Sequence, residues 1–180
     1  EQLTDDLKGF GSYGSQDGQF IWPVNIIPDG DQNLLISDEA TNRITKMSPE
    51  GEFISKFGIS GADGGQFNGP SGIALSPNGD IFVADSKNHR IQVYTSDGEF
   101  IDQFGEYGQK SGQLNLPWGI HIDELGQIYV CDWGNNRIQI FSKDGEYLNS
   151  FGEKGNSDGQ FNRPTGIAVD THGDIYVSDW

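Results

Sequence analysis

The sequence is poor in cysteine, in basic residues and in long apolar segments, and each scarcity narrows the possible functions. Cys131 is the only cysteine among 180 residues, so no disulfide can form within the chain. Lys and Arg number 11 against 27 Asp and Glu, which gives a formal net charge of −16. Because phosphate binding requires clustered cations, this balance disfavours nucleic acid and anionic membrane surfaces as partners.

No apolar run approaches the roughly 18 residues that span a bilayer, and no signal peptide is present. We therefore expect no membrane insertion. The chain begins with Glu1 rather than Met, which favours a processed or excised piece of a soluble protein. An extracellular or periplasmic location fits such processing, although no motif specifies the compartment.

Glycine is abundant, with 26 residues against 7 prolines, and aromatic and β-branched residues are plentiful. This composition is typical of many short strands joined by tight turns. An all-β protein is the first expectation.

A repeat organises the chain. Residues 127–139 read Q-I-Y-V-C-D-W-G-N-N-R-I-Q, which is an apolar run, a polar turn and a second apolar run. The pattern returns at residues 80–92, more loosely at 33–45 and in its first half at 174–180, with a period of 47 residues. We treat residues 1–180 as a single region with a tail at 1–17, repeats at 18–64, 65–111 and 112–158, and half a repeat at 159–180.

Four segments of each repeat have the pattern of strands. In the third copy they are residues 118–123, 127–131, 136–142 and 146–151. Short Asp/Gly turns at residues 123–126 and 143–145 join neighbouring segments. Four antiparallel strands per repeat, without helical periodicity, predict a β-propeller blade.

Three motifs recur in phase: an opening P-x-G-I-x-[VLI], a centre D-I-Y-V-x-D and a following N-x-R-I-Q. In these motifs the chain resembles the NHL repeat, the blade of a family of mostly six-bladed propellers. The first copy departs from the pattern, with Asn25 where the others have Gly72, Gly119 and Gly166. Six blades require about 280 residues at this period. The resemblance therefore implies an incomplete ring, which belongs to a longer protein or is completed by a homo-oligomer.

Residues that recur in every blade are expected to serve the fold. Each second strand ends in an Asp, followed five residues later by an Arg where the chain extends that far. These residues are Asp38, Asp85, Asp132, Asp179, Arg43, Arg90 and Arg137. We expect the Asp to bond the turn N–H groups or to pair with the Arg, rather than to form a ring of metal ligands. Asn88 and Asn135 are expected to take the left-handed turn conformation. We expect no cofactor and no metal.

Residues that differ between blades are better functional candidates. Trp118 stands where the other copies have Val24, Ser71 and Thr165, and His121 stands where they have Ile27, Ala74 and Ala168. We expect a ligand-binding set on the face that carries the inter-blade loops, with His121 near the central channel. The set comprises Trp118, Trp133, His121, His89, Trp180 and Trp22. The alternative is that each Trp fills space between adjacent blades.

Cys131 stands where the other copies have Ser37, Ala84 and Ser178. All are small residues that close a strand, so we expect a small buried side chain rather than a reactive thiol.

The favoured function is a non-catalytic recognition scaffold that binds a protein, peptide or glycan through its aromatic face. Because related propellers include an amidating lyase and sugar lactonases, the resemblance also implies an alternative enzyme, with a channel metal site at His121 completed by further blades. Enzymatic activity therefore stays open. A structural assembly module is the second alternative.

Overall fold

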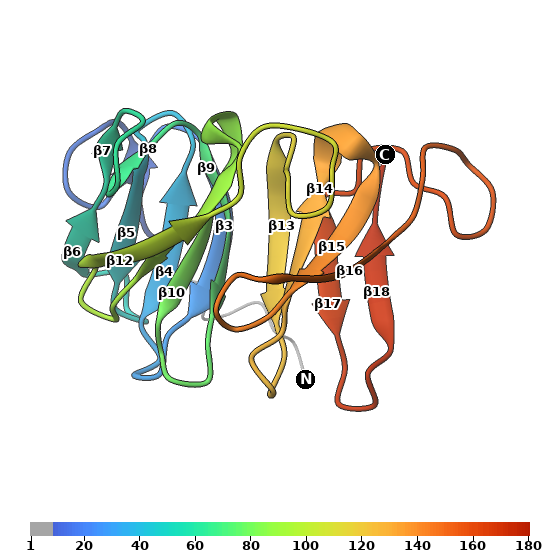
Figure 1. Cartoon of the computed structure of the whole chain (residues 1–180). Coiled ribbons are helices and arrows are strands. Elements are labelled where there is room, and N and C mark those ends of the chain that lie inside the picture. Colours follow the sequence, from blue (N-terminus) through green and yellow to red (C-terminus); the bar gives the residue numbers. More distant parts are fainter. Residues whose placement is uncertain (1–8) are drawn as a thin grey trace.

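The computed structural model describes residues 9–180, so the first eight residues of the expected 1–17 tail lie outside the described part. Within that part the fold is all-β, as predicted, and is a series of four-stranded antiparallel blades (Figure 1). Blade 1 contains β3 (Pro23–Pro28), β4 (Leu34–Asp38), β5 (Arg43–Met47) and β6 (Phe53–Phe57). Blade 2 contains β9 (Pro70–Leu75), β10 (Ile81–Asp85), β11 (Arg90–Tyr94) and β12 (Phe100–Phe104).

Blade 3 contains β13 (Pro117–Ile122), β14 (Ile128–Asp132), β15 (Arg137–Phe141) and β16 (Tyr147–Phe151). These bounds lie close to the strands predicted from the sequence. Half of a fourth blade follows as the hairpin of β17 (Gly166–Val169) and β18 (Ile175–Ser178). The predicted turns are also confirmed, since the Gly126 N–H donates to the Asp123 carbonyl at 3.0 Å and the Gly145 N–H to the Ser142 carbonyl at 3.0 Å.

The inter-blade loops fold back on themselves through very short parallel pairings. β1 (Ser12–Tyr13) pairs with β2 (Gln19–Phe20), and β7 (Ile59–Ser60) pairs with β8 (Gln66–Phe67). Single bridges join Tyr107 to Leu114 and Lys154 to Phe161 in the next two loops. Two 3₁₀ turns, Ser86–Asn88 and Trp133–Asn135, join the second and third strands of blades 2 and 3.

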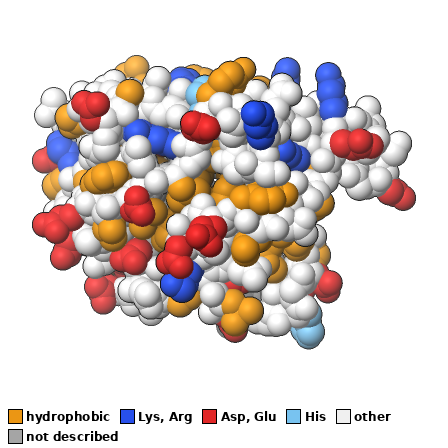
Figure 2. Space-filling model, in the orientation of Figure 1, with side chains coloured by type: hydrophobic (Ala, Val, Ile, Leu, Met, Phe, Trp, Pro, Cys, Tyr) orange, Lys and Arg blue, Asp and Glu red, His pale blue; other side chains and the backbone are white. Residues whose placement is uncertain are grey.

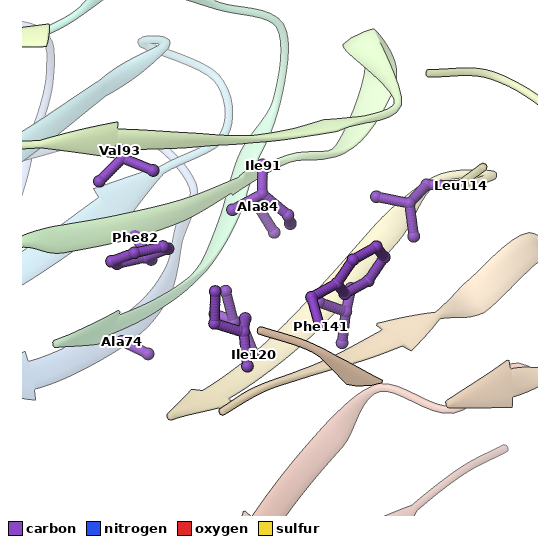
Figure 3. Close-up of a cluster of buried hydrophobic side chains, with 10 residues drawn as sticks. Ala74, Phe82, Ala84, Ile91, Val93, Leu114, Ile120 and Phe141 are labelled. Atoms are coloured by element: carbon purple, nitrogen blue, oxygen red, sulfur yellow. The ribbon is translucent and has the colours of Figure 1, made fainter. Parts of the chain in front are cut away.

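The core lies between blades. One cluster joins blade 1 to blade 2 and includes Leu35, Ile44 and Tyr94. The next joins blade 2 to blade 3 and contains Phe82 and Val93 of blade 2 with Ile120 and Phe141 of blade 3 (Figure 3). Because blades 1, 2 and 3 bury apolar side chains against one another, they share a core, as expected for a repeat protein.

The first strands of the blades, β3, β9, β13 and β17, contact one another in sequence order and form the inner wall. A Cβ on Gly72 would lie 2.4 Å from the carbonyl oxygen of Trp118, so glycine permits this close backbone approach. At the start of the series Ile26 is 53% exposed, whereas its equivalents Ile73 and Ile120 are 3% and 8% exposed. The face of blade 1 turned away from blade 2 is therefore uncovered in the described chain.

No helix in the described chain is long and apolar enough to cross a membrane. Acidic side chains are spread over the side of the molecule in Figure 2, whereas Lys and Arg lie mainly toward its upper edge, where the inter-blade loops run in Figure 1.

Candidate functional site

Two aromatic side chains of blade 3 stand at the end of the blade that carries the inter-blade loops. Trp118 is the second residue of β13, which enters from an inter-blade loop, and Trp133 opens the 3₁₀ turn that follows β14. Since the strands of a blade are antiparallel, both positions fall at the same end of the sheet. Both indoles are partly buried.

These two rings line a cavity of about 530 Å³ between blade 3 and the half-blade that follows. Its other lining residues are Thr165, Asp179 and Trp180. Three indoles therefore surround one hollow, with one hydroxyl and one carboxylate among them. The backbone N–H of Asn162 donates to Asp179 Oδ2 at 2.6 Å, which holds that carboxylate at the cavity wall.

The equivalent junction between blades 2 and 3 is closed. There the positions of Trp118 and Trp133 are taken by Ser71 and Ser86. Ser86 Oγ donates to the carbonyl oxygen of Pro117, and Ser71 Oγ lies 3.0 Å from that of Trp118. Two small hydroxyl side chains thus join blades 2 and 3 directly, whereas the two indoles at the same positions of blade 3 line a cavity beside Trp180, the last residue of the hairpin that follows.

A positively charged side chain packs against one face of the Trp133 ring. The guanidinium carbon of Arg163 lies 4.7 Å from the centroid of its ring, within the range of a cation–π interaction. The backbone N–H of Arg163 donates to Asn136 Oδ1 at 3.0 Å. Arg163 is not among the residues that line the cavity, so its guanidinium supports Trp133 from outside it.

The other three predicted residues, Trp22, His89 and His121, lie elsewhere. Trp22 belongs to blade 1, is 66% exposed, and donates its backbone N–H to Asp38 Oδ1 at 3.2 Å. His89 lies between blades 2 and 3, where its Nδ1 accepts a hydrogen bond from the Leu116 N–H at 3.0 Å and its ring packs against Tyr107. Of the predicted set, only Trp118, Trp133 and Trp180 share a cavity.

His121 lines a different cavity, of about 360 Å³, along the inner wall. Its neighbours there include Asn25, Ala74 and Ile167, and none of the lining residues is a carboxylate, a cysteine or a second histidine. Burial lowers the pKa of His121, although the carboxylate of Asp123 opposes this shift. Residues 9–180 contain no group of three or more His, Cys, Asp or Glu placed to hold a metal ion.

The recurring Asp and Arg are joined in two blades. Arg90 Nε donates to Asp85 Oδ2 at 2.9 Å, and Arg137 Nε donates to Asp132 Oδ2 at 2.8 Å. Both carboxylates are fully buried. In blade 1 Asp38 accepts from N–H groups, among them those of Ile21 and Thr41, but Arg43 bonds backbone carbonyls such as that of Ser15 instead of Asp38. The recurring Asp therefore pairs with the Arg in blades 2 and 3, and bonds N–H groups without the Arg in blade 1. Both arrangements were expected from the sequence.

The prediction that Asn88 and Asn135 adopt the left-handed conformation is wrong by one residue. The positive φ angles fall on the next positions, at Asn42, His89 and Asn136, with values of 54°, 56° and 55°. Asn88 and Asn135 instead donate from Nδ2 to Asp85 and Asp132, at 2.8 and 2.9 Å. The side-chain amides of Asn88 and Asn135 thus bond the buried carboxylates. The left-handed conformation belongs to the residue that follows each of them.

A family model described as the NHL repeat matches residues 67–94, 114–141 and 161–180. The chain therefore contains NHL repeats in these three segments. The matched segments begin at equivalent positions of blades 2, 3 and 4, and the looser first copy lies outside them. No curated protein sequence gives a significant match.

Solved propellers resemble this NHL chain in fold. Virginiamycin B lyase from Staphylococcus aureus has a TM-score of 0.67 at 20% identity, with 88% of this chain and 49% of that chain covered. A gluconolactonase from Xanthomonas campestris has a TM-score of 0.66 at 15% identity, covering 93% and 56%. A chain of a nidogen/laminin complex has a TM-score of 0.66 at 23% identity, covering 87% and 56%.

The NHL chain thus spans about half the length of these solved structures. They include both enzymes and a binding protein, and at these identities the likeness shows the fold alone. Arg163 and the serines at positions 71 and 86 were not predicted from the sequence to belong to the site. The comparison of the blades shows Ser71 as the small counterpart of Trp118, and Ser86 as that of Trp133, but it does not show which residues they contact.

Proposed function

We propose that this NHL chain is part of a non-catalytic recognition module that binds a protein partner through a peptide segment seated in the cavity between blades 3 and 4. One observation carries the proposal: the positions that hold Ser71 and Ser86 at a closed junction hold Trp118 and Trp133 at an open one. Indoles around a hollow are frequent anchors of a binding surface.

The chemistry of the lining favours a peptide over a glycan. Three of the five lining residues are tryptophans, and only Thr165 and Asp179 offer polar side chains. A sugar presents a hydroxyl on nearly every carbon, and the lining offers only these two polar side chains to pair with them. An apolar or aromatic peptide side chain loses little on entering and gains contact with the indole faces.

The test is a peptide and glycan array, followed by measured affinities for Trp118→Ser and Trp133→Ser. These exchanges install the residues that blade 2 holds at the same positions, so the blade is expected to fold. Loss of a hot-spot indole weakens binding by about 30-fold or more. Trp22→Ser is the control, since Trp22 is exposed and lies outside the cavity.

Unchanged binding in both blade 3 variants would overturn the proposed site. If the protein binds only glycans, and both variants lose this binding, the proposed site is correct but its ligand is a glycan rather than a peptide.

A lyase or hydrolase is the second candidate, and His121 is the observation that favours it. Its imidazole lines the inner cavity, and burial holds its pKa below the ordinary value, so the ring is neutral near pH 7. A stoichiometric zinc or calcium ion in the purified protein, lost in His121→Ala, would favour this candidate. Ala74 and Ala168 occupy the equivalent positions, so that variant is a conservative one.

A further inference from the structure

Three side chains of blade 2 hold three consecutive backbone groups that lead into the cavity wall. His89 Nδ1 accepts from the Leu116 N–H at 3.0 Å. Ser86 Oγ donates to the Pro117 carbonyl, and Ser71 Oγ lies 3.0 Å from the Trp118 carbonyl oxygen. The backbone position of Trp118 is therefore set from the neighbouring blade.

The bond to Leu116 has a counterpart at each blade junction. At the junction before it, Asn42 Oδ1 accepts from the Gly69 N–H at 2.8 Å, and at the junction after it, Asn136 Oδ1 accepts from the Arg163 N–H at 3.0 Å. All three acceptors and all three donors have positive φ angles. The bond thus ties one strained turn to another across the junction, and the acceptor is an amide in two cases and an imidazole in one.

An imidazole can accept this bond only while it is neutral. The Leu116 N–H is a donor, so Nδ1 must be unprotonated and the ring proton must lie on Nε2. Protonation converts Nδ1 into a second donor facing the first, which removes the bond. Asn42 and Asn136 do not titrate, and neither do the serines that hold Pro117 and Trp118.

We propose that His89 is a pH-responsive positioning residue. When neutral it holds the Leu116 end of the Leu116–Trp118 segment, and on protonation it releases that end, so that in acid only the two serines of blade 2 hold the wall of the Trp118 cavity. The link to ligand binding rests on the proposed function of that cavity. The release of the segment itself does not depend on any ligand.

The surroundings of His89 set the direction of the pH dependence. Burial lowers its pKa, while the carboxylates of Asp132 and Asp85 oppose the shift, and the ring of Tyr107 packs against it at 4.8 Å between centroids. A histidine whose pKa is lowered by folding favours the native state above its unfolded pKa of about 6.5. That contribution is lost as the pH falls from about 6.5 through the folded pKa.

The experiment is amide hydrogen exchange and NMR on the full chain between pH 8 and pH 5. Exchange is expressed as a protection factor, which removes the intrinsic dependence on pH. We expect the protection of the Leu116 amide to fall about tenfold or more as His89 titrates, because a backbone bond is lost. The Gly69 and Arg163 amides, held by asparagines, are internal controls that should keep their protection.

His89→Asn places at this junction the residue that the other two junctions already use. We expect this variant to keep Leu116 protected at every pH and to abolish the pH-dependent shift of the Trp118 indole N–H signal. Protection of Leu116 that does not change while His89 titrates, or an unaltered pH dependence in His89→Asn, would overturn the proposal. Neither outcome depends on ligand binding, so a failed peptide array would leave this result interpretable.

Discussion

Arg137 donates a hydrogen bond from Nε to Asp132 Oδ2 at 2.8 Å, at the point where β14 ends and β15 begins. The same carboxylate accepts from the side chains of Asn135 and Gln139 and from the backbone N–H of Asn115. One buried anion thus joins the second strand, the third strand and the incoming inter-blade loop. The arrangement repeats at Asp85.

Asp132→Ala should destabilise the chain by about 3–5 kcal/mol, because it leaves a partly buried guanidinium and two amides without their shared acceptor. Urea unfolding followed by tryptophan fluorescence measures this loss. Asp144→Ala is the matched control, since Asp144 pairs with Lys143 on the surface and exposed pairs contribute little. A loss equal to that of the control would show that the buried cluster contributes no more than a surface pair.

Blade 1 has an incomplete version of this cluster. Thr45 stands where blades 2 and 3 have Gln92 and Gln139. Its hydroxyl is buried without a hydrogen-bond partner, and so is Arg43 Nε. In blade 1, where Thr45 replaces the longer glutamine, the Arg43 guanidinium therefore lacks one of its hydrogen bonds.

Gln92→Thr should therefore convert blade 2 into the weaker form. Gln92 Nε2 bonds the Gln66 carbonyl at 2.6 Å and Asp85 Oδ2 at 3.1 Å, and its Oε1 accepts from the Gly65 N–H at 2.9 Å. Loss of three bonds costs about 2–4 kcal/mol in the free energy of unfolding. Gln109→Thr, at an exposed loop position, should change it by less than about 0.5 kcal/mol. Equal effects in the two variants would contradict the assigned role.

The sequence predicted the blades well because two local signals agreed. Apolar alternation placed the strands, and Asp/Gly pairs placed the turns, so the predicted strands of blade 3 lie close to those observed. The composition of the cavity was harder to predict. Strict alternation puts Trp118 and Ile120 on one face, but a register shift between Pro117 and Ile120 separates them. Ile120 packs toward blade 2, whereas Trp118 lines the cavity toward blade 4.

The role of His89 could not be read from the sequence for a related reason. Its position in the turn was evident, but its acceptor role depends on a bond to Leu116, which lies 27 residues further along the chain. The alignment places Asn42, His89 and Asn136 at one repeat position, which suggests a shared function. It does not show which backbone group each side chain bonds. Contacts between blades are set by the packing of whole sheets rather than by local pattern.

Gly72→Ala should destabilise the chain because the inner strands touch at this point. The added Cβ would lie 2.4 Å from the Trp118 carbonyl oxygen and 3.0 Å from the Ile120 nitrogen, both of which are backbone atoms. Overpacking of this kind costs about 1–3 kcal/mol. Gly30→Ala is the control, since nothing lies within 4 Å of its Cβ position. If both variants unfold at the same urea concentration as the parent, the close approach at Gly72 is not a packing constraint.

Cys131 should be inert to thiol reagents in the native protein and reactive only after unfolding. Its side chain is fully buried, and burial raises the pKa of its thiol to about 12, so almost no thiolate exists near neutral pH. Labelling by a disulfide reagent should therefore follow the fraction unfolded across a urea titration. Cys131→Ala should remove the signal and cost about 1 kcal/mol, because Ala84 fills the equivalent position in blade 2. Rapid labelling in the absence of urea would contradict the buried position and would mean that the junction between blades 3 and 4 opens without global unfolding.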